Sequence, residues 1–164
     1  MADNKRKETN QNKIQVLKVG NRIGIVHLEM VKEKRSLCGM ERFRNASEAA
    51  SIVRPLFNRA DREMMIVMSL DAKLIPIAVE VVAVGGIDSC MVDVRNIFKH
   101  AVISNASNII CFHNHPSGMP EPSADDRVIT KRMKNAGSLL GISLLDHIVI
   151  GDDNYYSLAE NKEL

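Results

Sequence analysis

The stretch HNHPSGMPEPSADD, residues 113–126, decides the expected fold and function of this chain. An apolar run over residues 109–112 leads into it and predicts a buried strand. His113 and His115 continue that strand at a period of two, so both imidazoles are expected on one face, roughly 6.5–7 Å apart along it. Two rings at this spacing can bind one ion.

A stiff loop and then a helix are expected after the two histidines. Three prolines and one glycine fall within residues 116–122, and such a segment cannot continue a strand. Ser123 is a favourable N-cap for the helical pattern that follows, which places Asp126 in the first turn, where free N–H groups and the helix dipole favour a carboxylate. Two imidazoles and one carboxylate without a thiolate are typical of Zn²⁺, and three protein ligands with a fourth position for water are typical of a catalytic zinc.

A simpler interpretation treats each histidine as a partly exposed polar residue at a strand end. The matching positions of Ser123 and Asp126 favour the metal site instead, because these residue types seldom coincide at this spacing by chance. The sequence therefore predicts a metal centre formed by His113, His115 and Asp126.

Composition and charge indicate one ordinary soluble domain. The chain has 164 residues, of which 45% are hydrophobic and 26% charged, and a second domain does not fit. Its formal net charge of +2 is too small to argue for nucleic-acid binding. Three widely spaced cysteines, Cys38, Cys90 and Cys111, with no Cys-x-x-Cys pair imply neither a disulfide framework nor a thiolate zinc knuckle. A cytoplasmic location is expected, since no apolar run approaches the ~20 residues of a membrane span and the start lacks the apolar segment of a signal peptide.

The expected organisation has three parts. Residues 1–13 are polar and without periodicity, which predicts a disordered tail, and residues 14–46 form an extension with a strand at 22–31. The remainder, 47–164, is the metal-binding domain. Its expected elements are a helix from Ser47, a hairpin of strands 64–70 and 74–84, a helix capped by Asp93, the strand of residues 109–115, a helix from Ser123 to Gly141, and a closing hairpin of 144–150 and 155–159. This order predicts an α/β fold with a mixed β-sheet flanked by helices.

Three other histidines receive predictions. His27 is expected to be partly buried and hydrogen-bonded within its strand, and His100 to be exposed, because it falls off the apolar stripe of its helix. Asp146 and His147 lie on opposite faces of the first closing strand, and one of them is a candidate to hydrogen-bond a metal-binding histidine.

Glu80 is the sharpest local anomaly, because it interrupts the apolar run of residues 77–84. Carboxylates are seldom fully buried unless they pair or do chemistry. One interpretation is that this face of the strand is exposed or that Glu80 meets an arginine. Beside a metal site that lacks a general base, a functional role is favoured instead.

Together these residues resemble a known motif. His113-x-His115-Pro116, then Ser123 and Asp126, with Glu80 upstream, looks like the JAMM motif of the JAB/MPN metalloproteases. The longer string from Glu80-Val81-Val82 through His113–Gly118 to Leu145-Asp146-His147 is similar to the RadC family within it, over roughly residues 47–160. The resemblance implies a RadC-like JAB/MPN domain with a cytidine deaminase-like fold and with zinc on His113, His115 and Asp126.

The resemblance also implies a function. The chain would be a zinc-dependent hydrolase that cleaves a peptide or isopeptide bond of a protein or peptide substrate with a metal-activated water. Glu80 would be the general base, a role typically worth about 10²- to 10⁴-fold, and Ser123 would steady the oxyanion. Longer RadC proteins carry an N-terminal domain of the helix-hairpin-helix type, for which this chain has no room. Residues 93–96 read Asp-Val-Arg-Asn where family members tend to have His-Pro-Arg-Glu, which removes the basis for expecting a shared substrate surface.

Three other classes of function fit the sequence less well. A DNA-repair-associated accessory role is the alternative, since the RadC family is traditionally linked to DNA repair, but four Phe, two Tyr and no Trp offer few stacking residues. A zinc deaminase needs His-x-Glu and a later Pro-Cys-x-x-Cys, which the chain lacks. A binding module that recognises a peptide without cutting it is disfavoured by the complete ligand set.

Overall fold

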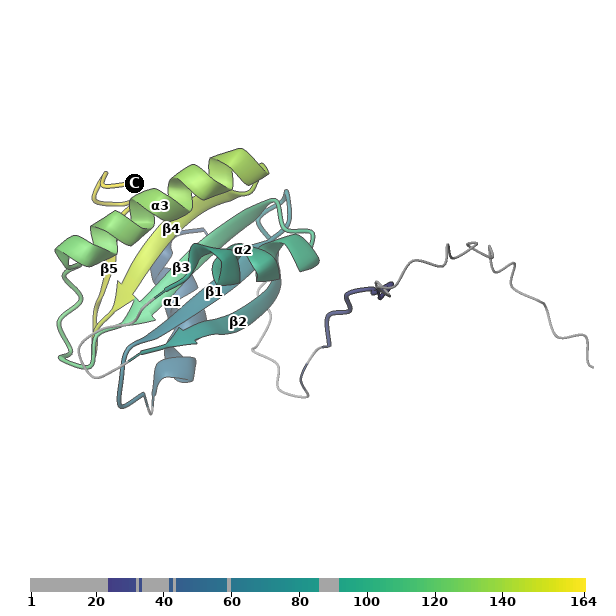
Figure 1. Cartoon of the computed structure of the whole chain (residues 1–164). Helices are drawn as coiled ribbons and strands as arrows, with labels where there is room; N and C mark the ends of the chain where they lie inside the picture. Colours follow the sequence, from purple (N-terminus) through teal and green to yellow (C-terminus); the bar gives the residue numbers. More distant parts are fainter. Residues whose placement is uncertain (1–23, 32, 34–41, 43, 59, 86–91) are drawn as a thin grey trace, which may run out of the picture.

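A five-stranded β-sheet forms the centre of the structure, a computed structural model that describes residues 24–31, 33, 42, 44–58, 60–85 and 92–164 (Figure 1). Its strands are β1 (Met64–Leu70), β2 (Pro76–Val84), β3 (Asn108–Asn114), β4 (Ser143–Ile150) and β5 (Tyr155–Ser157). They lie in the order β2-β1-β3-β4-β5, with β3 and β4 parallel and the other neighbours antiparallel. The predicted mixed sheet is confirmed.

Three helices cover the sheet: α1 (Ala46–Phe57), α2 (Val94–Ile103) and α3 (Ala124–Leu140). In Figure 1, α2 and α3 lie in front of the sheet and α1 lies behind it. The core accordingly has two layers, one packed around Val53 and Phe57 of α1 and the other around Phe98 of α2 and Met133 of α3. β3 is buried over residues 109–114 because both layers press on it.

Side-chain caps set the helix boundaries. Asp93 accepts a hydrogen bond from the Arg95 N–H and Ser123 accepts one from the Asp126 N–H, as the sequence predicts. Gly141 ends α3 in the left-handed conformation with φ 69°, also as predicted. The cap of α1 is Asn45 rather than Ser47, because the Asn45 side chain accepts from the Glu48 N–H.

The sheet register brings three chain segments to one edge. Met65 of β1 pairs with His113 of β3, and His113 pairs with Val149 of β4. Since β3 and β4 are parallel, both end at this edge, and the antiparallel β1 begins there. Side chains at such an edge, outside the carboxyl ends of strands, are well placed to bind a ligand.

Several local predictions are wrong. Residues 24–31 form no strand and are exposed, His27 included, while the predicted tail of residues 1–13 lies outside the described residues. His100 is only 8% exposed, because its Nδ1 lies 3.0 Å from the Oγ of buried Ser69. Each helix in the described ranges is too short or too polar to cross a lipid bilayer.

Candidate metal centre

His113, His115 and Asp126 meet at the sheet edge, as the sequence predicts. The two Nε2 atoms lie 3.0 Å apart. His113 Nε2 is 3.2 Å from Asp126 Oδ1, and His115 Nε2 is 3.5 Å from Asp126 Oδ2. Among the described residues, these three form the group of His, Cys, Asp or Glu side chains close enough to hold one metal ion.

Asp126 is fixed by the start of α3. Its Oδ2 accepts hydrogen bonds from the Ser123 N–H at 2.7 Å and from the Ser123 hydroxyl at 2.6 Å, which completes a capping box. Burial would raise the pKa of Asp126, but the neighbouring imidazoles of His113 and His115 outweigh burial and hold the pKa well below its usual range. The carboxylate is therefore ionised and oriented toward the two imidazoles.

His115 is oriented by the loop that follows it. Its Nδ1 lies 2.8 Å from the carbonyl oxygen of Met119. A carbonyl can only accept, so Nδ1 carries the proton of the neutral ring and Nε2 carries a lone pair. The hydrogen bond with Asp126 raises the pKa of His115 despite its partial burial, so a proton competes for that lone pair as the pH falls.

The donor set fits zinc. Ligands about 2.0–2.1 Å from a tetrahedral zinc lie about 3.3–3.4 Å from one another, and the three pairs here are separated by 3.0, 3.2 and 3.5 Å. Two imidazole nitrogens and one carboxylate also match zinc in ligand type. Three protein ligands leave a fourth tetrahedral position for water or substrate.

A buried histidine supports His113 from behind. His147 Nε2 lies 2.9 Å from His113 Nδ1, and His147 Nδ1 lies 2.6 Å from Thr130 Oγ1. Burial lowers the pKa of His147 well below its ordinary value, so the ring is neutral. The sequence offered Asp146 or His147 as the hydrogen-bond partner of a metal-binding histidine, and His147 is the one that contacts His113. Asp146 instead accepts hydrogen bonds from Ser157 Oγ and from the N–H groups of His147 and Ala159.

Ser123 lies beside the ligands at the surface. Its hydroxyl donates to Asp126 Oδ2 and accepts from the Asp126 N–H at 3.1 Å. The residue is exposed, so its side chain is accessible to a molecule bound at the metal centre. Its expected action on an oxyanion stays a prediction.

Glu80 is not brought to this group. It pairs with Val67 of β1, and Val67 pairs with Cys111 of β3, so Glu80 lies two strands away from His113 and one side-chain step back along the sheet. Its charge acts on His100, whose pKa is lowered by burial and raised in part by Glu80. β2 is the edge strand and Glu80 is exposed, which explains why a carboxylate is tolerated there. This exposure matches the alternative of a solvated glutamate, and the expected role of Glu80 as general base stays a prediction.

Glu63 is a second carboxylate near this edge of the sheet. It directly precedes β1 and is two residues before Met65, the partner of His113. Asn114 fixes this segment, since its Oδ1 accepts from the Met64 N–H at 2.9 Å and its Nδ2 donates to the Arg62 carbonyl at 3.2 Å. The charge of Glu63 contributes to the raised pKa of His115, after the larger effect of Asp126.

No local pattern singled out Glu63. It follows Asp61 and Arg62 in a short polar turn, where an acidic residue is unremarkable. The relevant signal is the antiparallel pairing of β1 with β3, which brings the start of one strand beside the end of the other. That pairing joins segments about 50 residues apart, as in the bond from Met64 to Asn114.

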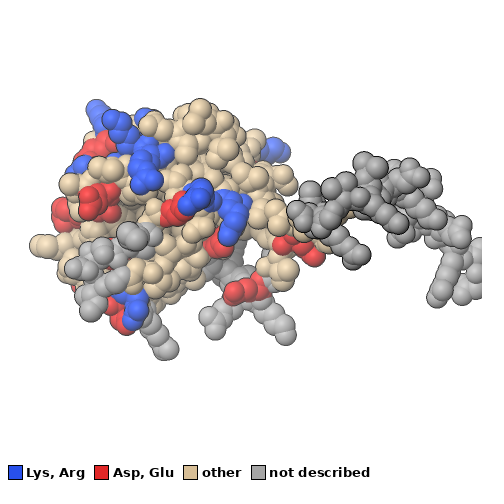
Figure 2. Space-filling view, viewed as in Figure 1, with Lys and Arg blue, Asp and Glu red and all other residues tan. Residues whose placement is uncertain are grey.

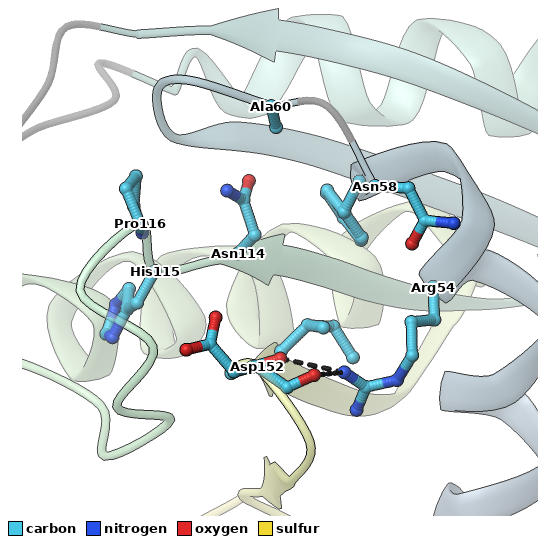
Figure 3. Close-up of a pocket in the computed structure, with 10 residues that line it drawn as sticks. Arg54, Asn58, Ala60, Asn114, His115, Pro116 and Asp152 are labelled. Carbon is cyan, nitrogen blue, oxygen red and sulfur yellow. Dashed lines mark hydrogen bonds between the residues drawn. The ribbon is translucent and has the colours of Figure 1, made fainter.

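A pocket of about 320 Å³ opens beside His115 (Figure 3). Polar groups from three segments line it, among them Asn58 after α1, Asn114 at the end of β3 and Asp152 after β4. Figure 3 shows the Asp152 carboxylate and the His115 ring on the same side of this space. The volume is at the lower end of the range for small-ligand pockets.

The loop that holds His115 is anchored on the turn after β4. The Asp152 N–H donates to the Gly118 carbonyl at 3.2 Å, and Gly118 has φ 79°, a conformation that favours glycine. Arg54 of α1 holds the turn in place, since its guanidinium donates to the carbonyls of Gly151, Asp152 and Asn154 at 2.8, 2.5 and 2.8 Å. The segments around the candidate metal centre are therefore held by contacts from α1, from the turn after β4 and from the loop after β3.

Comparisons with known proteins point to one family. The sequence profile described as a RadC-like JAB domain matches residues 43–163. A UPF0758 protein of Thermotoga maritima is 44% identical over 104 residues, which cover 63% of this chain and 47% of that protein. A UPF0758 protein of Clostridium perfringens is 43% identical over 114 residues, or 70% of this chain and 50% of that protein. The chain thus spans about half the length of the curated relatives it matches.

Proposed function

The chain belongs to the RadC-like JAB domain family, and on this basis we propose that it is a zinc-dependent hydrolase that cleaves a peptide or isopeptide bond. One observation carries the proposal. Two histidine Nε2 atoms 3.0 Å apart face one ionised carboxylate, and a cation between them relieves the repulsion of their lone pairs. The family alone supports the hydrolase class, and this geometry supports the metal.

His113, His115 and Asp126 would hold the zinc. Zinc bound there would polarise a substrate carbonyl and lower the pKa of a water molecule toward ~7. Glu63 is a candidate proton acceptor beside Glu80, because Asn114 fixes the segment around Glu63 at the edge of the sheet where β3 ends. It would pass the proton to the leaving amine, so the products would be a carboxylate and an amine.

Ser123 and the pocket supply the remaining roles. The Ser123 hydroxyl lies beside Asp126 at the surface, where it could turn from that carboxylate to an oxyanion. The pocket beside His115 would receive a side chain next to the scissile bond. Its lining combines polar side chains such as Asn58, Asn114 and Asp152 with the cation of Arg54 and the apolar Phe57 and Ile150.

Metal content tests the proposal first. The purified full chain is loaded with zinc, excess metal is removed, and zinc per chain is measured by mass spectrometry. About one zinc is expected for the wild type and none for His113→Ala/His115→Ala. His100→Ala is the matched control, because it removes another buried histidine that is hydrogen-bonded to a hydroxyl, outside the site, and it should keep the zinc. A wild type that retains no zinc would overturn the proposal.

Hydrolysis is then screened with the zinc-loaded chain on fluorogenic peptide and isopeptide libraries. Cleavage that disappears in His113→Ala/His115→Ala and returns when zinc is restored to chelated wild type supports the reaction class. A zinc-loaded wild type that cleaves neither library would leave a metal-dependent binding module as the better description.

DNA-linked function stays a prediction without support from the described surface. On the face shown in Figure 2, the Lys and Arg side chains over α3 form a small group with acidic side chains at its margin rather than a basic stripe across the face. Nucleic-acid binding depends on such a stripe. Affinity for DNA that falls steeply with added salt would revive this alternative.

A further inference from the structure

A chain of hydrogen bonds runs from the backbone of α3 to the back of His113. Thr130 Oγ1 lies 2.5 Å from the Asp126 carbonyl oxygen and 2.6 Å from His147 Nδ1. His147 Nε2 lies 2.9 Å from His113 Nδ1. Thr130, His147 and His113 are all at most 2% exposed, so water does not substitute for any of these contacts.

The direction of each bond follows from the first acceptor. The Asp126 carbonyl can only accept, so the single hydroxyl proton of Thr130 points to it. Thr130 Oγ1 must then accept from His147, which places the proton of that neutral ring on Nδ1 and a lone pair on Nε2. That lone pair accepts from His113 Nδ1–H, so the lone pair of His113 is on Nε2, toward His115 and Asp126.

The opposite direction is disfavoured. It would turn the Thr130 hydroxyl toward His147 and leave two oxygen lone pairs, those of Thr130 and the Asp126 carbonyl, facing each other at 2.5 Å in a buried place. It would also put a proton on His113 Nε2, where it could donate to Asp126 Oδ1 at 3.2 Å but would block the metal. One hydroxyl therefore selects between a metal-binding and a blocked form of the site.

We propose that Thr130 and His147 are positioning residues that hold His113 in the Nδ1–H tautomer and so present its Nε2 lone pair to the metal. This inference rests on the proposed zinc site and adds two residues to it. Neither residue touches the metal, and both act through the direction of a proton. The peptide carbonyl that starts the chain belongs to Asp126 itself, so one ligand sets the tautomer of another.

The tautomers are measured in the full chain without metal, by two-bond ¹H–¹⁵N correlation spectra of the histidine rings near pH 8. His113, His115 and His147 are each expected with the proton on Nδ1. Neutral histidine in water prefers the proton on Nε2, so this pattern would not arise by default. A wild-type His113 with its proton on Nε2 would overturn the proposal, and this measurement needs no variant to fold.

Variants test the role of the hydroxyl. Thr130→Val keeps the branched shape and removes the hydroxyl, so His147 and His113 are expected to move their protons to Nε2, and zinc affinity to fall about 10- to 100-fold. Thr130→Ser keeps the hydroxyl and should restore both readouts. Ser69→Ala is the matched control, because it breaks the buried Ser69–His100 hydrogen bond and should leave His113 and zinc affinity unchanged.

The outcomes separate the two proposals. A Thr130→Val variant that folds with an unchanged His113 tautomer and unchanged zinc affinity would overturn the positioning role. A wild type with three Nδ1–H rings that binds no zinc would overturn the proposed function and still support the direction of the hydrogen bonds.

Discussion

Gly151→Ala is expected to disturb the metal centre without touching a ligand. A Cβ at Gly151 would overlap the Gly118 carbonyl oxygen and the Asn154 side chain, and it would lie 3.2 Å from Pro120 Cδ. The Asn154 side chain can rotate away, but the Gly118 carbonyl is backbone and has to shift on the order of 1 Å. The neighbouring Met119 carbonyl holds His115 Nδ1 at 2.8 Å.

The magnitude follows from that distance. A comparable shift of the Met119 carbonyl would lengthen its contact with His115 to about 3.8 Å, which is no longer a hydrogen bond. Loss of such a support typically lowers metal affinity about 10- to 100-fold, or about 1.4–2.7 kcal/mol. Overpacking should cost a further ~1–3 kcal/mol in the free energy of unfolding.

Two assays separate these effects. Zinc affinity is measured by competition with a chromogenic chelator, and stability by urea unfolding in a metal chelator. Gly137→Ala is the matched control, because its Cβ would overlap a backbone carbonyl as well, that of Ile142, in the last turns of α3. It should lose stability and keep its zinc affinity. If both variants lose zinc equally, or if Gly151→Ala binds zinc as the wild type does, the argument is refuted.

Three further predictions follow from the same contacts. With any substrate that is found, Glu63→Gln should lower turnover about 10²- to 10⁴-fold and keep the zinc. Glu80→Gln should leave both turnover and zinc content unchanged. Loss of turnover in Glu80→Gln but not in Glu63→Gln would return the general-base role to Glu80. Asn114→Ala should lower the free energy of unfolding in urea by about 2 kcal/mol, because it breaks two hydrogen bonds worth about 1 kcal/mol each. Asn108→Ala, at the other end of β3, breaks one hydrogen bond and should cost about half as much. Equal losses of stability in the two variants would contradict this reasoning. Burial lowers the pKa of His100, so below about pH 6.5 the unfolded state binds a proton that the folded state does not. Between pH 7 and 5 the wild type should therefore lose stability relative to His100→Asn, by at most about 1.4 kcal/mol per pH unit. A difference in unfolding free energy between the two proteins that does not change with pH would exclude this effect.

The ligand set could be predicted from the sequence because its determinants are local. His113 and His115 belong to one strand end, and Asp126 to the first turn of the next helix. Period-two alternation, a proline-rich loop and an N-cap fix their relation without long-range information. The resemblance to the RadC family rested on the same residues, and the family profile confirms it.

The parts that could not be predicted depend on which strands are neighbours. For Glu80 the sequence left an exposed face and a functional role open, and its exposure became clear only because β2 lies at the edge of the sheet. Glu63 and His147 approach the ligands only through the pairing of β1 and β4 with β3. His100 was expected to be exposed from its helix alone, and Ser69 on β1 supplies the partner that buries it.

The hydrogen bonds of Asn114 also bear on folding accuracy. A slip of one residue between two strands turns every side chain to the opposite face, and here it would exchange Asn114 with a histidine. The amide then could not reach the backbone of residues 62 and 64, and both imidazoles would point away from Asp126. The triplet His113-Asn114-His115 thus couples the register of β1 and β3 to the site: a chain that pairs these strands incorrectly also fails to bring His113 and His115 to Asp126.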